Sequence, residues 1–125
     1  MERIEDNDRL WRRIDFRNPD FQIKEDGKPA SSNFTLKKIN GEFEDGLSVD
    51  LERLTTYEDS IQDEERFRLF ALVAGDVRTL DLDCINNGLP HPAHSLITGE
   101  LLQKKSTARK LAQLSIQVDN PRFNV

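Results

Sequence analysis

Five side chains that can bind a metal ion or move a proton fall within 14 residues: Asp81, Asp83, Cys84, His91 and His94. Carboxylates, a thiolate and imidazoles are the ligands that zinc and harder divalent cations take from proteins. Their spacing matches no established metal motif. In an extended strand Asp81 and Asp83 would lie on one face and Cys84 on the other, so the ligands could not converge without a bulge. We therefore expect no metal ion or other cofactor, with His94 hydrogen-bonded at the start of a strand.

A second group is formed by Trp11, Arg12 and Arg13 near the N-terminus. An indole beside two guanidinium groups can stack on a ligand or bind an anion. The same residues can instead bury the indole beneath the arginine side chains. Further along, Ser31 and Ser32 occupy a loop, where hydroxyls can donate to a phosphate or carboxylate or satisfy their own backbone in a turn. Both interpretations stay open for each group.

The third group is a basic helix start that also carries the hydroxyls of Ser106 and Thr107. A helix N-terminus presents free amides and can bind a phosphate, but no glycine-rich loop precedes it, so a nucleotide-binding loop is not indicated. The alternatives are a solvated helix face and a surface that recruits an acidic partner. The basic candidates are Lys104, Lys105, Arg109 and Lys110.

Enzyme classes can be compared with these residue types. An ADP-ribosylating transferase places an Arg or His on an early strand, a small hydroxyl residue on a second strand and an acid on a late one. Arg12 or Arg13, Ser48 and Glu100 have suitable types, but their spacing does not single them out. Neither a serine nor Cys84 lies in the strand–turn–helix context of a hydrolytic nucleophile, so no hydrolytic triad is expected.

The elements that must position these groups are read from periodicity. A half-buried strand is predicted over residues 47–51, where apolar and polar residues alternate strictly. Thr55 and Glu58 follow at capping-box spacing, so a short acidic helix should begin there. Other strands are predicted over residues 9–17, 66–74, 80–84 and 93–98, and Asp76 is expected to cap a single helical turn. A helix with Ser106 as N-cap is predicted over 105–116, with a core-facing stripe of Ala108, Leu111, Ala112 and Ser115.

These elements predict an α+β fold: a single compact domain with a mostly antiparallel or mixed sheet and two short helices, the C-terminal helix packed on the sheet. A chain of 125 residues, 36% of them hydrophobic, suits one core. We expect residues 1–8 to be a flexible N-terminus and residues 9–116 to form the domain. Residues 117–125 are then a tail that is disordered or docks through Phe123.

The charge pattern limits the partners. The net charge is −5 and 33% of the residues are charged, which predicts a soluble protein and argues against a general nucleic-acid binder. Residues 1–65 hold 18 acids and 10 bases, and residues 66–125 hold 5 acids and 8 bases, so the halves carry −8 and +3. No apolar run approaches the roughly 20 residues of a membrane span. A polar, acidic N-terminus and a single cysteine predict a cytoplasmic protein without an internal disulfide.

Four blocks carry a resemblance: GKPASSNF (27–34), LSVDLERLTT (47–56), AHSLITG (93–99) and KKSTARKLAQL (104–114). Together they resemble a family of short bacterial proteins without an assigned activity. Those proteins tend to carry Pro where this chain has Tyr57, and Asn where it has His91. The resemblance implies a single compact domain of bacterial type and supplies no chemistry.

From these observations the leading expectation is a non-enzymatic protein-interaction or regulatory subunit of a larger bacterial system. It would bind a protein partner and have no membrane association. The alternative is a small enzyme acting on a nucleotide or nucleic acid, either ADP-ribosyltransferase-like or nuclease-like. It would use the surfaces of Trp11, Arg12, Arg13, Ser31, Ser32 and His94. Convergence of these residues on one concave cavity would favour the enzyme, and scatter over a convex surface would favour the interaction subunit.

Overall fold

The alternating segment predicted as a half-buried strand forms β4 (Leu47–Leu51) in the computed structural model, which describes residues 1–121. Its three apolar side chains are buried, whereas Ser48 is exposed and Asp50 is half-buried. The other strands of the same sheet are β1 (Arg9–Asp15), β5 (Phe67–Val73), β6 (Asp83–Asn86), β7 (His94–Thr98) and β8 (Ile116–Gln117). They form a six-stranded sheet of order β6-β7-β4-β1-β5-β8, antiparallel at each pairing. The protein is a single compact α+β domain, as predicted.

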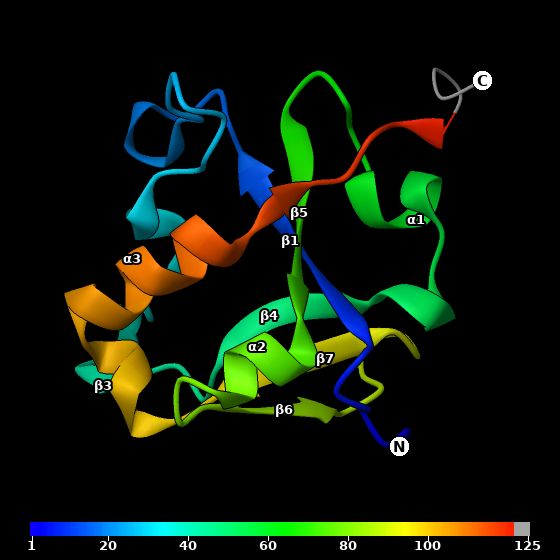
Figure 1. The fold of residues 1–125 in the computed structure, drawn as a ribbon, viewed down its shortest axis with the longest axis vertical. Helices are drawn as coiled ribbons and strands as arrows, with labels where there is room; N and C mark the ends of the chain where they lie inside the picture. Colours follow the sequence, from blue (N-terminus) through cyan, green and yellow to red (C-terminus); the bar gives the residue numbers. More distant parts are fainter. Residues whose placement is uncertain (122–125) are drawn as a thin grey trace.

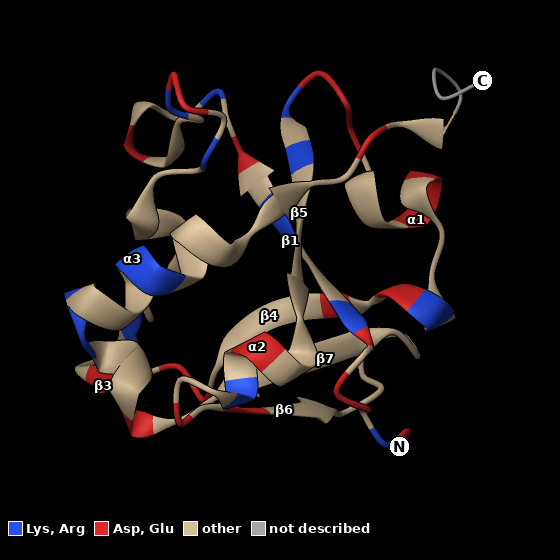
Figure 2. Cartoon of the chain, in the orientation of Figure 1, with Lys and Arg blue, Asp and Glu red and all other residues tan. Residues whose placement is uncertain are grey.

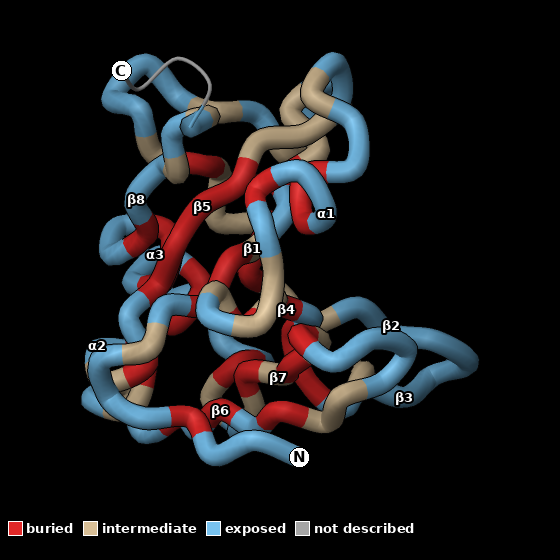
Figure 3. Tube along the Cα trace, turned by 90° about the vertical axis from the view of Figure 1, so that its right-hand side faces the viewer, coloured by how far each residue is buried: buried red, intermediate tan, exposed pale blue. Residues whose placement is uncertain are grey.

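The sheet is strongly twisted. In Figure 1 the strands β4, β7 and β6 run across the view, whereas β5 runs nearly vertically. A separate hairpin of β2 (Lys38–Ile39) and β3 (Glu42–Phe43) projects from the body (Figure 3). Its turn residues Asn40 and Gly41 have φ values of 53° and 84°. Two successive positive φ angles are the requirement of a type I′ turn, which is why Asn-Gly predicts a hairpin here.

Within the described residues, three α-helices accompany the sheet: α1 (Tyr57–Ile61), α2 (Ala74–Arg78) and α3 (Lys105–Leu114). The prediction that Asp76 caps a turn is wrong, since Asp76 lies inside α2. β5 runs directly into this helix, and the amides of Ala74 and Gly75 donate to the carbonyls of Asp8 and Asp6 at 2.9 and 2.8 Å. Backbone from the N-terminal segment therefore does the work of a capping side chain.

The other predicted caps are also misplaced. The N-cap of α1 is Thr56, whose Oγ1 accepts from the Asp59 amide at 3.2 Å, because Thr55 closes the preceding 3₁₀ turn through its own amide. Ser106 is likewise not the N-cap of α3, because Lys104 occupies that position without a capping side chain. Residues 80–82 are not strand: the turn after α2 continues through Asp81, which has a φ of 58°.

The core lies in two clusters on opposite faces of the sheet, because successive strand residues point to opposite faces. On β1, Leu10 joins the larger cluster, and Trp11 joins the smaller. The larger cluster packs under α3 through the predicted stripe of Ala108, Leu111 and Ala112. The smaller cluster packs with α1 and consists of Trp11, Tyr57, Ile61, Leu69 and Ala71. Buried residues follow β5 and the centre of the sheet in Figure 3.

The N-terminal segment contacts the domain body. Ile4 is buried, and the Arg78 guanidinium donates to its carbonyl at 2.7 Å and to the Asp6 carboxylate at 2.6 Å. These contacts tie residues 1–8 to the domain, although the flexibility expected for them stays a prediction. The expected docking of Phe123 lies outside the described residues. Within residues 1–121, none of the helices has the length and apolar character needed to cross a membrane.

Candidate active site between strands β1 and β4

The candidate site begins where two central strands diverge. β1 and β4 are paired only through Leu10 with Leu51 and Trp11 with Asp50. Beyond Trp11 the chain of β1 continues its pairing with β5 alone. Within the part of the chain that the structure describes, the backbone edge of β4 around Ser48 therefore has no strand partner on its β1 side. Side chains fill the opening instead.

Arg12 bridges this opening. Its Nη1 donates to the Ser48 carbonyl at 2.8 Å, and its Nε donates to the Asn33 carbonyl at 2.9 Å. Burial lowers the pKa of Arg12 to about 10, while the Glu44 carboxylate opposes the shift and the neighbouring Arg13 adds to it. The guanidinium therefore stays charged at neutral pH. The two bonds engage two of its roughly five N–H groups, so donors remain for a ligand.

A cavity of about 320 Å³ opens beside this bridge, and we call it the histidine cavity. Its volume falls at the lower end of the range typical of ligand sites, about 300–1,000 Å³. Cationic, acidic, hydroxyl and imidazole groups meet in it from β1, β4, α1, β7 and the loop before β7. Its polar side chains include Arg12, Arg13, Ser48, Asp50, His91 and His94.

His94 sits between a hydroxyl and an amide. β4 and β7 pair with Asp50 opposite His94, so Ser48 lies diagonally across from the imidazole on the same face of the sheet. The His94 Nε2 lies 3.3 Å from the Ser48 Oγ, and its Nδ1 lies 2.7 Å from the Asn87 Oδ1. An amide oxygen can only accept, so Asn87 holds the proton on Nδ1 and leaves the Nε2 lone pair facing the serine hydroxyl. This is the geometry of a nucleophile, a base and an orienting group.

The protonation state of His94 suits a base. Burial lowers the pKa of its imidazole from the usual value of 6.5, Asp50 opposes this shift, and His91 reinforces it. The ring is therefore neutral at pH 7 and can accept a proton at Nε2.

Asp50 organises the opposite side of the cavity. It accepts a hydrogen bond from the Ser60 Oγ at 2.6 Å, and its other oxygen lies 3.5 Å from the His91 Nε2. The rings of His91 and His94 meet edge to face with centroids 6.0 Å apart. One carboxylate thus anchors α1 and positions a second imidazole next to the base.

The structure brings some of the predicted site residues together and separates others. Trp11, Arg12, Arg13 and His94 line the histidine cavity, but the Trp11 indole is buried and donates to the Glu52 carboxylate at 2.8 Å. Ser32 lines a neighbouring cavity, whereas Ser31 is not among the described residues that line either one.

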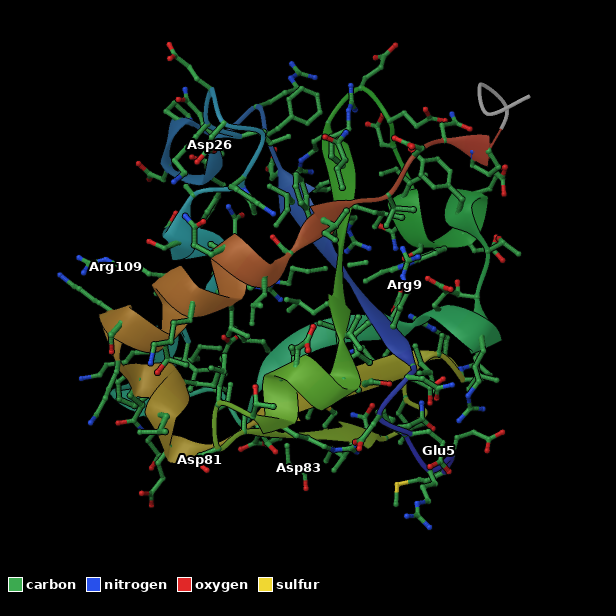
Figure 4. The ribbon with its side chains drawn as sticks, in the orientation of Figure 1. Glu5, Arg9, Asp26, Asp81, Asp83 and Arg109 are labelled. Atoms are coloured by element: carbon green, nitrogen blue, oxygen red, sulfur yellow. The ribbon has the colours of Figure 1, made fainter. Side chains whose placement is uncertain are left out.

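The basic residues Lys104, Lys105, Arg109 and Lys110 are exposed on or next to α3 and do not line the histidine cavity. Figure 2 shows basic positions along this helix, and Figure 4 shows the Arg109 side chain extending away from it.

Two groupings suggested by the sequence are not assembled. Glu100 follows the far end of β7 and does not line the histidine cavity. It therefore does not supply the late-strand acid of an ADP-ribosylating arrangement in that cavity. The residue of β7 that lines the cavity is His94, at the start of the strand. Among residues 1–121, no three His, Cys, Asp or Glu side chains gather closely enough to hold a metal ion. Burial raises the pKa of the Cys84 thiol to about 11, so it is not a ready thiolate ligand.

Sequence reasoning does not anticipate the contacts that Asn87 and Asp50 make with the two histidines. The alternation of β4 does place Ser48 and Asp50 on one face, but only the pairing of β4 with β7 sets His94 beside them. Asn87 is not among the candidates from the sequence, whereas its amide oxygen lies 2.7 Å from the His94 Nδ1 and orients the imidazole.

No family model matches the chain, and no curated protein or solved structure matches it either.

Proposed function

We propose that this protein is a small enzyme that acts on a nucleotide, with the histidine cavity as its active site. The observation that carries the proposal is the Ser48–His94–Asn87 arrangement, which opens into a cavity also lined by two arginines. A base with a fixed tautomer is needed to activate a hydroxyl nucleophile, and the bond to Asn87 supplies that tautomer. Guanidinium groups beside it suit a substrate that carries phosphate.

The chemistry follows from the geometry. His94 Nε2 takes a proton from an O–H nucleophile, either the Ser48 hydroxyl or a hydroxyl or water that binds next to it. The nucleophile forms a P–O bond to a phosphorus of the nucleotide, the bond from that phosphorus to the leaving oxygen breaks, and the His94 imidazolium returns its proton to that oxygen. Arg12 and Arg13 stabilise negative charge that develops on the phosphate or on the leaving oxygen. Asn87 keeps the imidazole in the required tautomer throughout the reaction.

A direct test incubates the full-length protein with a panel of nucleotides, including a mononucleotide, a dinucleotide and a short RNA. Products are identified by chromatography and mass spectrometry. We expect one of these substrates to be converted, and we expect His94→Gln to lower the rate by about 100-fold or more. Ser48→Ala separates two mechanisms: a loss as large as that of His94→Gln identifies Ser48 as the nucleophile, and a smaller loss identifies a substrate hydroxyl or water.

Ser106→Ala is the matched control, because Ser106 is exposed on α3 and its replacement removes a hydroxyl of the same kind. Its rate should equal that of the wild type. Conversion of no nucleotide on the panel, or an unchanged rate in a folded His94→Gln variant, would refute the proposal.

A second candidate is a cytoplasmic regulatory subunit that binds an acidic protein partner through α3. The observation that favours it is a surface groove lined by Arg109 and Lys110 together with Leu80 and Leu114. Basic groups beside an apolar floor suit an acidic, amphipathic segment. This role and the catalytic one use different faces, so each can be tested without the other.

A further inference from the structure

A second cavity, of about 330 Å³, lies on the other side of Arg12 and Arg13, and we call it the arginine cavity. Its charged lining consists of Arg12, Arg13, Lys37 and Arg66 against Asp15, which gives a formal charge of +3 from four bases and one acid. Counting Glu44, whose carboxylate accepts from the Lys37 amide at 3.0 Å and attracts Arg12, still leaves +2. The whole chain carries −5, so this cavity opposes the sign of the molecule.

The arginines of this cavity are held in place before any ligand arrives. Arg13 and Arg66 lie over the ring of Phe67, with guanidinium carbons 4.9 and 4.7 Å from its centroid. The Arg66 Nε and Nη2 both lie 3.1 Å from one oxygen of Asp15. Arg12 is fixed by the carbonyls of Asn33 and Ser48. Fixed guanidinium groups lose little side-chain entropy when they bind an anion, and their planar donor arrays match phosphate oxygens.

The two cavities share a wall. Arg12 and Arg13 line both, so an anionic group bound to these arginines in the arginine cavity lies next to the histidine cavity. Ser32 and Asn33 also line the arginine cavity, but their donors are already engaged. The Ser32 hydroxyl donates to the Asp20 carbonyl, and the Asn33 side-chain amide donates to two carbonyls at 2.9 and 3.3 Å. The cationic side chains are therefore the groups that would bind a phosphate.

We propose that the arginine cavity binds the phosphate groups of a nucleoside diphosphate or dinucleotide whose reacting part occupies the histidine cavity. The proposal rests on the proposed function, because it takes the histidine cavity as the place of reaction. It narrows the substrate class to nucleotides with at least two phosphates. It also assigns Arg66 and Lys37 as binding residues that take no part in proton transfer.

The test measures binding and turnover separately on the full-length protein. Calorimetry with inorganic pyrophosphate, ADP and adenosine should show binding of the first two and none of adenosine. Arg66→Gln and Lys37→Gln should each weaken ADP binding by about tenfold or more, since each removes a charge-assisted contact. Arg3→Gln is the matched control, because the Arg3 side chain is 87% exposed and lines neither cavity, and it should leave the affinity unchanged. Arg66→Gln removes the ion pair between Arg66 and Asp15, so its melting temperature is measured to show that the variant is folded. Lys37→Gln provides a second variant that leaves this ion pair intact.

The outcomes separate this inference from the proposed function. Binding of pyrophosphate that is lost in Lys37→Gln and Arg66→Gln but kept in His94→Gln supports the phosphate site, even when no substrate is turned over. Turnover that depends on His94 but is unchanged in both Arg66→Gln and Lys37→Gln leaves the active site standing and overturns the phosphate site. No binding of pyrophosphate or ADP, or equal binding by the variants, also overturns it.

Discussion

Replacing Arg12 should destabilise the protein about twice as much as replacing its neighbour Arg13. Arg12→Met keeps most of the aliphatic stem and removes the guanidinium that bridges β1 to β4. The bond to the Asn33 carbonyl is partly buried, and a bond from a charged donor in such a place contributes about 1.5–3 kcal/mol. The bond to the Ser48 carbonyl is exposed, so water can replace the donor and the loss there is about 0.5–1 kcal/mol.

The sum of these two losses is about 2–4 kcal/mol. Burial lowers the pKa of Arg12 to about 10, which indicates a desolvation cost that the methionine relieves, so the loss should fall nearer the lower bound. Arg13→Met removes one longer bond, 3.2 Å to the Ser60 carbonyl, and an exposed contact with Phe67. That loss should be about 1 kcal/mol.

Urea denaturation followed by tryptophan fluorescence measures both, because Trp11 is the single tryptophan and lies beside both arginines. The midpoint should shift while the slope m stays constant, since the surface exposed on unfolding is unchanged. Far-ultraviolet circular dichroism should give the same midpoints when unfolding is two-state. Equal free energies of unfolding for the two variants would refute the bridging role of Arg12.

Three further predictions follow from burial, charge and protonation. Val49→Asp should abolish soluble folding, because it places an unpaired carboxylate in the larger core cluster at a cost of several kcal/mol; a soluble variant with the wild-type melting temperature would contradict this. The double variant Lys105→Glu, Arg109→Glu should weaken the binding of an acidic partner, mostly at low salt concentration. Its melting temperature should barely change, since exposed charges contribute about 0.5 kcal/mol or less to the free energy of unfolding. Binding equal to that of the wild type at every salt concentration would show that this face is only solvated. Because the pKa of His94 is lowered, the folded state binds a proton at this imidazole less well than the unfolded state does. The free energy of unfolding is therefore highest at pH 7 and above. It declines as the pH falls through 6.5 towards the lower pKa of the folded state. Melting temperatures between pH 8 and pH 5 should therefore fall less steeply in His94→Gln than in the wild type, and identical slopes would contradict the assignment.

Local periodicity in the sequence determines much of the fold. The alternation in residues 47–51, the apolar second half of β5 and the stripe on α3 each predict burial. The predicted apolar residues are buried in all three, except that Val73 at the end of β5 is exposed. The Asn40-Gly41 turn is equally predictable, because the positive φ angles it needs are a property of those two residues. Such signals depend on residues within a few positions of one another.

Features that the sequence does not predict depend on groups far apart in the chain. The amides at the start of α2 are satisfied by carbonyls of residues 6 and 8, so no capping residue is needed near Asp76. The candidate site depends on the pairing of β4 with β7, which sets His94 beside Ser48 across 46 positions of sequence. Alternation fixes which residues share a face of a strand, but it does not fix which strand lies next to it or in which register. The separation of β1 from β4 beyond Trp11 depends on the twist of the whole sheet and on the core that packs on each of its faces. Both involve residues from the entire domain, so only the tertiary structure decides where the two strands part.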